Sequence, residues 1–356
     1  MNIHILDREF NLVGVIDAYS SVIWRPAYYD VGDFELYLDA STESVELLKT
    51  DYYLVRGQDI TVDDEGNTTL KKVMIIKNHT ISTDIEGGDY LTVTGRELKY
   101  ILNQRIIWSQ TNLTGNVVTA IERLVNENAI APADKNRVIP NLKLDESLTV
   151  SDKIDKQLTG DKLDEAITEI CMTYHIGYEI YIKNKKLVFR LYQGVDRSTN
   201  PPHVIFSEEF ENILSSEYEH NAENYANTTL IGGEGEGVER IYTTVGANNS
   251  GLDRYELFTD ARDISQNKDS DEAIDINTYY NLLSERGLEK LSENAITEAF
   301  TGEVQHDVNF NYGTEYYLGD TVKIVNKYGL SANVKVLSVI ESHDENGEKI
   351  IPQFEN

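Results

Sequence analysis

Basic side chains are scarce in this chain of 356 residues, which has 32 Lys and Arg against 61 Asp and Glu and a formal net charge of −29. A surface that binds nucleic acid needs Lys and Arg to neutralise phosphates, and docking on anionic lipid needs them as well. The composition therefore argues against both kinds of binding. It remains compatible with a channel through which DNA passes without specific binding, because like charges repel.

Cysteine and proline are also scarce, at one and six residues. A single cysteine, Cys171, cannot form an internal disulfide, so the sequence does not indicate an oxidising compartment. The residues Met1 to His4 lack the basic stretch and apolar run of a signal peptide. No stretch approaches the ~20 apolar residues of a membrane helix. We therefore expect a chain that is made in the cytoplasm and does not insert into a membrane.

Tyrosine is abundant by contrast, at 22 residues, and it suits half-buried strands as β-branched residues do. Residues 1–100 are predicted to be mostly strands. Phe34, Leu36 and Leu38 alternate as in a strand with one buried face, and Glu9 to Asn11 would form the tip of a hairpin. Ser41 or Thr42 could cap a short helix that follows.

The middle of the chain, residues 98–200, has helical spacing and is interpreted as an α/β domain. Its clearest helix has apolar positions separated by four, three and four residues: Leu163, Ile167, Ile170 and Tyr174. Asp161 is available as the cap of this helix. Two alternating runs then predict a hairpin that turns at Asn184.

The last part of the chain returns to strands after the dipeptide Pro201-Pro202, which marks a boundary. A helix is predicted over 277–300, and four of its apolar residues share one face: Leu288, Leu291, Ala295 and Ala299. The fold class is thus α+β and mainly β. We expect a first β domain at 1–97, the α/β domain at 98–200, and a second β region formed by 201–276 and 301–356, on which the helix 277–300 packs.

The glycine-rich run 232–237 invites comparison with a phosphate-binding loop. Such a loop needs a following helix and usually a Lys. Here Glu234 and Glu236 would repel phosphate, and Val238 to Thr244 reads as another strand. We therefore predict a flexible hairpin or a loop that faces a lumen.

The other candidate sites favour structural interpretations. The seven histidines lack the spacing of a zinc site, and Cys171 is interpreted as a small core residue of the predicted helix. Asp59, Asp63, Asp64 and Glu65 lack the order of a calcium loop. Carboxylate pairs are too numerous in this acidic chain to indicate a glycosidase. We predict no catalytic residue, no metal and no cofactor.

The segment 207–275 is the most acidic part of the chain. Its Asp and Glu residues are opposed only by Arg240, Arg254, Arg262 and Lys268. The segment would form either a solvated face or an acidic lining or docking surface.

Three segments together resemble the tail-tip, or baseplate hub, proteins of long-tailed phages and prophages. The first is Val22-Ile23-Trp24-Arg25 with 28–36, the second runs from 93 to 107, and the third is 317–322 with the ending 349–354. Their order and spread make the resemblance specific over essentially the whole chain. The motif residues that we single out are Arg25, Gly32, Gly95, Arg96, Arg105, Gly319 and Asp320.

The resemblance implies a phage baseplate hub fold, with two β-barrel-like hub domains and α/β insertions. It also implies a homotrimer in the virion tail, in which two similar barrels per chain would match a sixfold tail ring. The implied partners are a distal tail ring protein, a tape-measure protein and receptor-binding or spike proteins. The motif glycines would provide unusual backbone conformations, and the arginines would bind carboxylates or carbonyls.

Two alternatives of another class stay open. A cell-wall glycan hydrolase would require carboxylates clustered in a cleft. A carbohydrate-binding adhesin would use tyrosine rings as stacking platforms. We expect a structural protein and not an enzyme.

Overall fold

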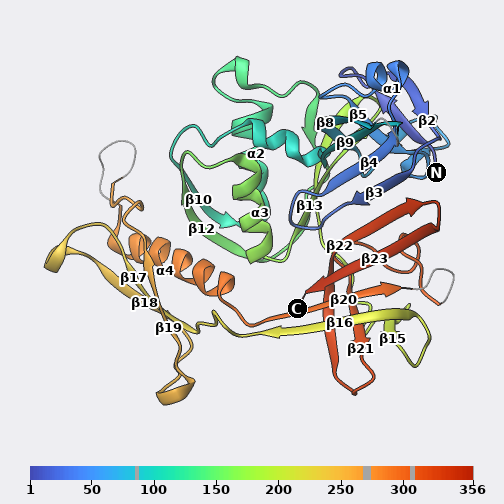
Figure 1. The fold of residues 1–356 in the computed structure, drawn as a ribbon. Helices are drawn as coiled ribbons and strands as arrows, with labels where there is room; N and C mark the ends of the chain where they lie inside the picture. Colours follow the sequence, from blue (N-terminus) through green and yellow to red (C-terminus); the bar gives the residue numbers. More distant parts are fainter. Residues whose placement is uncertain (85–87, 268–273, 305–308, 356) are drawn as a thin grey trace.

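The computed structural model describes residues 1–84, 88–267, 274–304 and 309–355. The largest sheet draws its strands from both ends of the chain (Figure 1). Its N-terminal strands are β1 (Ile3–Leu6), β2 (Leu12–Ile16), β3 (Ser21–Arg25), β4 (Asp33–Asp39), β5 (Tyr53–Arg56), β8 (Met74–Asp84) and β9 (Gly88–Glu97). Its C-terminal strands are β15 (Ile205–Ser207), β16 (Ile213–Asn221), β20 (Thr297–Val304), β21 (Thr321–Val325), β22 (Ser331–Asp344) and β23 (Gly347–Glu355).

This sheet is open and continuous between the two halves. Its order is β16-β20-β23-β22-β3-β4-β9-β8-β5-β1-β2, with β21 on β22 and β15 on β21. Residues 341–344 of β22 pair antiparallel with 21–24 of β3. Because β22 occupies the edge of β3, the halves share one sheet, and within the described residues neither half closes into a barrel. The mainly β class is confirmed, but the two expected barrels are not seen as closed barrels.

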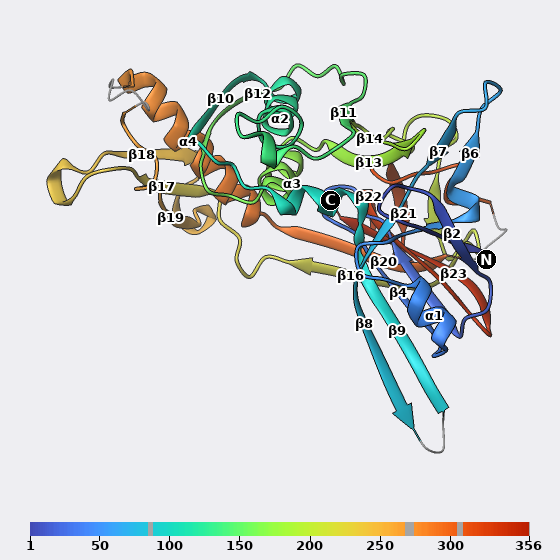
Figure 2. The same cartoon turned by 90° about the horizontal axis from the view of Figure 1, so that it is seen from above.

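The N-terminal strands follow the predicted pattern. Phe34, Leu36 and Leu38 of β4 are all buried, and β1 and β2 form a hairpin at the predicted place. The short helix α1 (Thr42–Leu47) begins at Ser41, whose hydroxyl accepts from the Ser44 amide in a reciprocal capping box. The strands β8 and β9 form a long hairpin that projects from the body (Figure 2).

The middle of the chain combines helices with small sheets. Its strands are β10 (Thr111–Asn116), β11 (Leu142–Leu144), β12 (Lys153–Leu158), β13 (Gly177–Lys183) and β14 (Lys186–Tyr192). Its helices are α2 (Val117–Val125), α3 (Leu163–Thr173), a π-helix (Asn126–Ile130) and 3-10 helices at Leu98–Gln104 and Lys135–Arg137. The hairpin of β6 (Ile60–Val62) and β7 (Thr68–Leu70) adds to β13 through Leu70 and Ile182. A segment from 60–70 therefore completes the sheet of the middle block.

Helix α3 buries the predicted positions Leu163, Ile167 and Ile170. The prediction that Asp161 caps it is wrong. The helix begins after Lys162 without a side-chain cap, because the Asp161 carboxylate instead accepts a hydrogen bond from the Thr159 amide at 3.2 Å. The predicted hairpin that turns at Asn184 is confirmed by the pairing of β13 with β14.

The strands β17 (Thr228–Gly232), β18 (Tyr242–Gly246) and β19 (Glu256–Asp260) form a small sheet with helix α4 (Ile276–Glu293) on one face. We call this unit the arm. Figure 1 shows α4 between the arm sheet and the body, on the side of α3 and β12. Short 3-10 helices, Gly237–Glu239 and Gly251–Asp253, lie in the connections between the strands.

The predicted extent of the arm helix is wrong. Helix α4 ends at Glu293, and β20 begins at Thr297 and pairs with β16. Its buried side chains include Tyr279, Leu282 and Leu283, which pack with Ile231, whereas Leu288 is exposed. The strand partner of 297–304 is distant in sequence, so helical spacing could not reveal where the helix ends.

Among the described residues, no helix is both long and apolar enough to cross a membrane.

A buried ion-pair network joins the two halves of the large sheet. Arg56 is 0% exposed and binds Asp59 at 2.5 Å and Glu341 of β22 at 2.9 Å. Its guanidinium also lies over the ring of Trp24, 5.3 Å from the centroid. Lys72 lies 3.3 Å from the same glutamate. Burial alone would raise the pKa of Glu341, but the charges of Lys72 and Arg56 outweigh it and lower the pKa.

We expect Glu341→Gln to lower the free energy of unfolding by roughly 3–5 kcal/mol, because it leaves the buried Arg56 short of one carboxylate. The contribution of Glu341 should be present at neutral pH and disappear as the pH falls below the ordinary range of a glutamate, since its folded-state pKa is lowered. Urea unfolding from pH 7 to pH 3 measures both effects. Glu293→Gln, in an exposed pair with Lys290, is the control and should cost less than about 1 kcal/mol. An equal loss in both variants would contradict the role of the network.

Candidate functional site

Tyr28, a fully buried residue between β3 and β4, contacts both the middle block and the C-terminal part of the chain. Its hydroxyl donates to the carbonyls of His175 and Tyr192 in the middle block, both at 3.3 Å. Its amide donates to the carbonyl of Leu337 in β22 at 2.7 Å. Burial raises the pKa of Tyr28 to about 12, so the hydroxyl keeps its proton at neutral pH. One side chain therefore connects the N-terminal, middle and C-terminal parts of the chain.

Glycines make room for this ring. A Cβ at Gly177 would lie 2.1 Å from Tyr28 Cε2, and a Cβ at Gly319 would lie 2.2 Å from the same atom. Gly319 also has a φ of +84°, which side chains rarely adopt. A Cβ at Gly194 would lie 2.0 Å from the Gly319 carbonyl carbon. We call the contact of Tyr28 with Gly177 and Gly319, together with Gly194 that packs on Gly319, the tyrosine junction.

Asp320 fixes the C-terminal side of the junction. It is 2% exposed, and its carboxylate accepts from the amides of Val195 at 2.7 Å and Tyr317 at 3.0 Å. It also forms an ion pair with Arg197 at 3.3 Å. These donors compensate for the burial of the charge. Asp320 therefore ties the segment after β14 to the turn that precedes β21.

A second buried pair lies on the N-terminal side. Glu97 accepts from the amides of Gly32 at 3.1 Å and Ala27 at 3.4 Å, and it lies 3.5 Å from the ammonium of Lys99. Burial raises the pKa of Glu97, and the charge of Lys99 opposes that rise. Lys99 donates to the Ala27 carbonyl at 2.7 Å. These bonds hold the loop 26–32, and hence Tyr28, against the 3-10 helix that follows β9.

The remaining motif residues lie on β3, on β9 and in the middle block. Arg25 binds Asp33 through two nitrogens, at 3.1 and 2.5 Å, and Arg96 lies 3.8 Å from the same carboxylate. At Gly95, a Cβ would lie 1.9 Å from the Ile75 carbonyl oxygen of β8. Arg105 is not part of this group, because it donates to the carbonyls of Arg137 and Val138 and holds that loop.

A cleft with a volume of about 610 Å³ lies beside the tyrosine junction. Its lining includes Glu179 and Arg190, which pair at 3.3 Å, and Arg197, which pairs with Asp320. Lys72 and Glu341 of the buried network also line it. These charges are already paired within the chain. The cleft therefore has the character of a structural boundary between parts of the fold.

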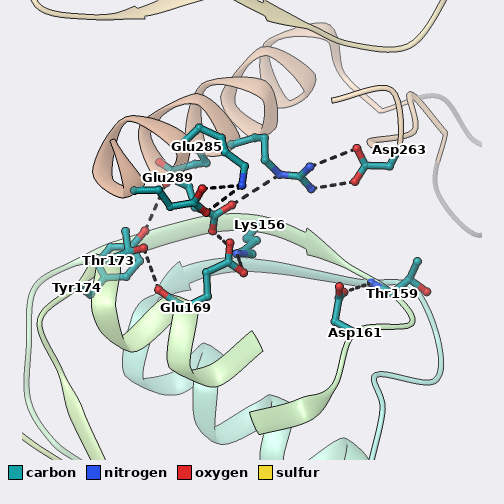
Figure 3. Close-up of polar contacts among 12 residues, drawn as sticks. Lys156, Thr159, Asp161, Glu169, Thr173, Tyr174, Asp263, Glu285 and Glu289 are labelled. Atoms are coloured by element: carbon teal, nitrogen blue, oxygen red, sulfur yellow. Dashed lines mark hydrogen bonds and ion pairs between the residues drawn. The ribbon is translucent and has the colours of Figure 1, made fainter. Parts of the chain in front are cut away.

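The arm docks on the body through a cluster of charged residues between α4, α3 and β12 (Figure 3). Lys156 of β12 contacts both Glu289 of α4 and Glu169 of α3, the latter at 2.9 Å. Arg286 lies 3.6 Å from Glu289 and binds Asp263 at 2.9 Å. We call Lys156, Glu169, Arg286 and Glu289 the arm clamp.

The surroundings of Glu289 in the arm clamp favour its protonated form more than is usual for a glutamate. Burial raises the pKa of Glu289, Lys156 opposes the rise, and the hydrogen bond and charge of Glu169 add to it, so that the pKa reaches about 7. Burial would also raise the pKa of Glu169, but Lys156 and the hydrogen bond with Glu289 lower it. Nearby, burial raises the pKa of Glu285, whose carboxylate lies 3.4 Å from the Tyr174 hydroxyl. Protonation of Glu289 therefore relieves the repulsion between the two clamp carboxylates.

The glycine-rich run 232–237 lies in the connection between β17 and β18, which pair antiparallel, so the hairpin predicted here is present. Arg240 donates to the carbonyls of Gly232 at 2.7 Å and Gly233 at 3.0 Å. The Glu234 amide donates to the Tyr279 hydroxyl of α4 at 2.7 Å. These hydrogen bonds hold the first residues of the run. A 3-10 helix, Gly237–Glu239, then comes before β18, where a strand was predicted from Val238.

The other rejected candidates have structural surroundings. Burial raises the pKa of the Cys171 thiol well above its ordinary value, which disfavours a thiolate nucleophile. His175 lies with its Nδ1 3.2 Å from the Tyr29 hydroxyl, and burial lowers its pKa. Asp59 belongs to the buried network around Arg56. Across the part of the chain that the structure describes, no group of three or more His, Cys, Asp and Glu side chains could hold a metal ion.

Tyrosine serves both the cores and the surface. The largest fully buried side chains include Tyr28, Tyr178, Tyr279 and Tyr316, whereas five other rings are exposed: Tyr242, Tyr255, Tyr280, Tyr317 and Tyr328. Rings that pack inside the fold cannot serve as stacking platforms for a sugar. The tyrosine count alone is therefore not an argument for the adhesin alternative.

The basic residues of the acidic segment 207–275 gather on the arm. Arg254 pairs with Glu256 at 2.6 Å, and Arg240 and Arg262 both pair with Asp260, each at 2.6 Å. The fourth, Lys268, lies outside the described residues. The segment is thus not uniformly acidic in space, because its arginines share one face.

Sequence reasoning did not identify the centre of the tyrosine junction or the arm clamp. Tyr28 lies in the first segment that carries the resemblance, but no sequence pattern distinguishes it there. No local pattern distinguishes Gly177 either. The clamp joins Lys156 and Glu289 across 133 positions. Such contacts are long-range pairings that a single sequence does not reveal.

Comparison with known proteins relates the whole chain to phage tails. The model of the family described as Siphovirus ReqiPepy6 Gp37-like protein matches residues 2–354. The tail protein from Neisseria meningitidis MC58 has a similar structure, with a TM-score of 0.56 at 14% identity over 99% of this chain and 96% of that chain. No curated protein matches the sequence.

Two prophage proteins give the same picture. The 43 kDa tail protein of prophage MuSo2 from Shewanella oneidensis has a TM-score of 0.58 at 12% identity, over 99% of this chain and 98% of that chain. The prophage tail protein gp18 from Listeria monocytogenes EGD-e has a TM-score of 0.53 at 11% identity, over 99% and 94%. At such identities, the likeness shows a shared fold.

We expect Gly319→Ala to destabilise the chain by roughly 1–3 kcal/mol more than Gly329→Ala, because only the first places a Cβ against the Tyr28 ring and overpacks a core. Gly329 is the matched control, since it has a φ of +78° and open space where its Cβ would be. Urea unfolding of the two variants gives the difference. Equal losses would mean that backbone conformation alone requires glycine at position 319.

We expect the unfolding free energy to fall between about pH 4.5 and pH 7 through Glu289, because the folded state keeps a proton that the unfolded state releases at lower pH. Glu289→Gln mimics the protonated form. It should remove this slope and stabilise the chain at pH 8 by on the order of 2 kcal/mol. Glu293→Gln, at the exposed end of the same helix, should keep the slope. A slope that persists in Glu289→Gln would refute the raised pKa of Glu289.

Proposed function

The chain belongs to the family of Siphovirus ReqiPepy6 Gp37-like proteins, and we propose that it is a structural hub at the tip of a phage tail. The family match over residues 2–354 carries this proposal. The fold shared with tail proteins over 99% of the chain supports it. As a member of a tail protein family, the chain is assigned to the virion tail.

We propose a scaffold role without catalysis. The motif residues bind other parts of the chain: Asp320 and Glu97 accept from backbone amides, and Arg105 donates to backbone carbonyls. The cleft beside the tyrosine junction is lined by charges that pair with one another. These side chains hold parts of the chain in fixed positions relative to one another, which is what a structural component of a ring requires.

The proposed assembly is a homotrimeric ring that closes the tail tube. Its partners would be a distal tail ring protein, a tape-measure protein and receptor-binding or spike proteins. DNA would pass through the ring during ejection without specific binding, because a chain with a net charge of −29 repels phosphate. A closed ring of identical chains needs the same contact repeated head to tail.

We expect light scattering on the purified chain to show a concentration-dependent species with a mass near three times 40.4 kDa. The control is the same series in high salt, which should favour assembly by screening repulsion between acidic chains. A species of two or four copies, or a monomer at every concentration and salt, would contradict the trimer. Family membership would still hold in that case.

A further inference from the structure

The two tryptophans of the chain have opposite surroundings. Trp24 is fully buried in the large sheet, whereas Trp108, in the loop between the 3-10 helix at Leu98–Gln104 and β10, is 68% exposed. Folded proteins usually bury most of so large an apolar ring. Trp108 lines neither the cleft beside the tyrosine junction nor the hollows along α4. Its ring is therefore an apolar group on the open surface that contacts within the chain leave largely uncovered.

The backbone that carries Trp108 is held by polar groups of the middle block. Its amide donates to the side-chain oxygen of Asn128 at 3.4 Å. Asn128 is 4% exposed and belongs to the π-helix Asn126–Ile130, a kind of turn that is frequent at functional sites. Arg137 donates to the same oxygen at 3.2 Å and to the Ile106 carbonyl at 2.6 Å. The loop is therefore ordered before any partner arrives, which lowers the entropic cost of binding through the ring.

Arg137 also places a positive charge beside the ring, with its guanidinium 5.0 Å from the Trp108 centroid. In the described part of the chain, neither Arg137 nor its neighbour Arg105 forms an ion pair, and both donate to carbonyl or amide oxygens. Burial and the charge of Arg137 lower the pKa of Arg105. Arg123 of α2, by contrast, pairs with Glu127 at 2.7 Å, and the arginines of the arm are paired as well. Two cations beside the exposed ring thus lack carboxylate partners.

The segments around the ring keep this surface positive. Backbone and side-chain hydrogen bonds bring together the stretches 104–110, 134–138 and 159–162. They contain four basic and two acidic residues: Arg105, Lys135, Arg137, Lys162, Asp134 and Asp161. Both acidic side chains accept backbone amides, of Asn136 at 2.9 Å and of Thr159 at 3.2 Å. The local balance is therefore the reverse of that of the whole chain, which has 32 basic and 61 acidic residues.

We infer that Trp108 with Arg105 and Arg137 forms a docking surface for an acidic segment of another protein, in which carboxylates flank an apolar side chain. The apolar side chain packs on the indole ring, and the carboxylates meet the unpaired positive charge. Trp and Arg are among the side chains that contribute most to protein interfaces. The proposed ring does not itself require this surface, so the inference adds a partner contact to the proposed function.

The charge and shape of the surface favour a short protein segment over other anions. A nucleic acid carries a continuous row of phosphates, which would extend from this small basic surface over the surrounding acidic chain and be repelled there. Small-molecule ligands bind mainly in concave sites, whereas the Trp108 ring is open to solvent. A segment with a few carboxylates can stay within the basic surface.

The first test selects ligands without assuming their sequence. A random peptide library is panned on the intact chain and then depleted on Trp108→Ala, so that the peptides that require the ring remain. We expect the remaining sequences to be enriched in Asp and Glu around an aliphatic or aromatic residue. A pool without that enrichment, or an empty pool, would overturn the inference.

The second test measures the affinity of one selected peptide by fluorescence anisotropy. Trp108→Ala should raise Kd by about tenfold or more, Arg137→Gln should raise it several-fold, and high salt should weaken binding to the wild-type chain. Two controls should leave Kd unchanged. Tyr328→Ala removes another ring, 78% exposed on the β21–β22 turn, and Arg123→Gln removes a cation that is already paired. Equal losses in the controls, or binding that is insensitive to salt, would contradict the inference.

Folding of each variant is checked by circular dichroism melting. Arg137 also holds the loop, so Trp108→Ala, which changes an exposed side chain, decides the test if Arg137→Gln does not fold. Polygalacturonate serves as the competitor that represents an anionic glycan, and it should not displace the peptide. Displacement that disappears in Trp108→Ala would assign the surface to a glycan and overturn the inference. Peptide binding by a chain that light scattering shows to be monomeric would support the docking surface and still contradict the proposed trimer.

Discussion

The contact of Tyr28 with Gly177 and Gly319 is the constraint on which the rest of the architecture depends. At both glycines even a methyl group would overlap the ring. The hydroxyl and the amide of Tyr28 bind carbonyls of the middle block and of β22. Because close packing transmits displacement and does not absorb it, this contact holds the three parts of the chain against one another.

Buried charges reinforce this arrangement at places that apolar packing does not reach. Arg56 and Glu341 join strands from opposite ends of the sequence, while Glu97 and Asp320 hold loops by accepting backbone amides. A buried charge without partners is costly, so each of these groups favours a single arrangement of its neighbours. The arm clamp differs, because its two glutamates share one Lys and the pKa of one of them, Glu289, is raised toward neutrality. The contribution of the clamp to stability therefore depends on pH.

Local patterns predicted much of the secondary structure, and they failed where distant partners decided. Alternation at Phe34, Leu36 and Leu38 identified a strand, and spacing at Leu163, Ile167 and Ile170 identified a helix. The same spacing continued past Glu293 and predicted helix where β20 pairs with β16. The hairpin predicted at the glycine-rich run is present, but its contacts with Arg240 and Tyr279 were not predicted. Where the helix was extended too far, the deciding hydrogen bonds come from β16, which is far away in the chain.

The sequence by itself determined the mainly β class and the acidic charge and indicated the tail protein family, because these depend on composition, local periodicity and recognisable segments. Only the tertiary structure decided that the two β regions share one open sheet, that Tyr28 connects the N-terminal, middle and C-terminal parts of the chain, and that the arginines of an acidic segment gather on one face of the arm. These are properties of contacts between distant residues. A sequence pattern predicts which side chains are buried, but it does not predict which residues they pack against.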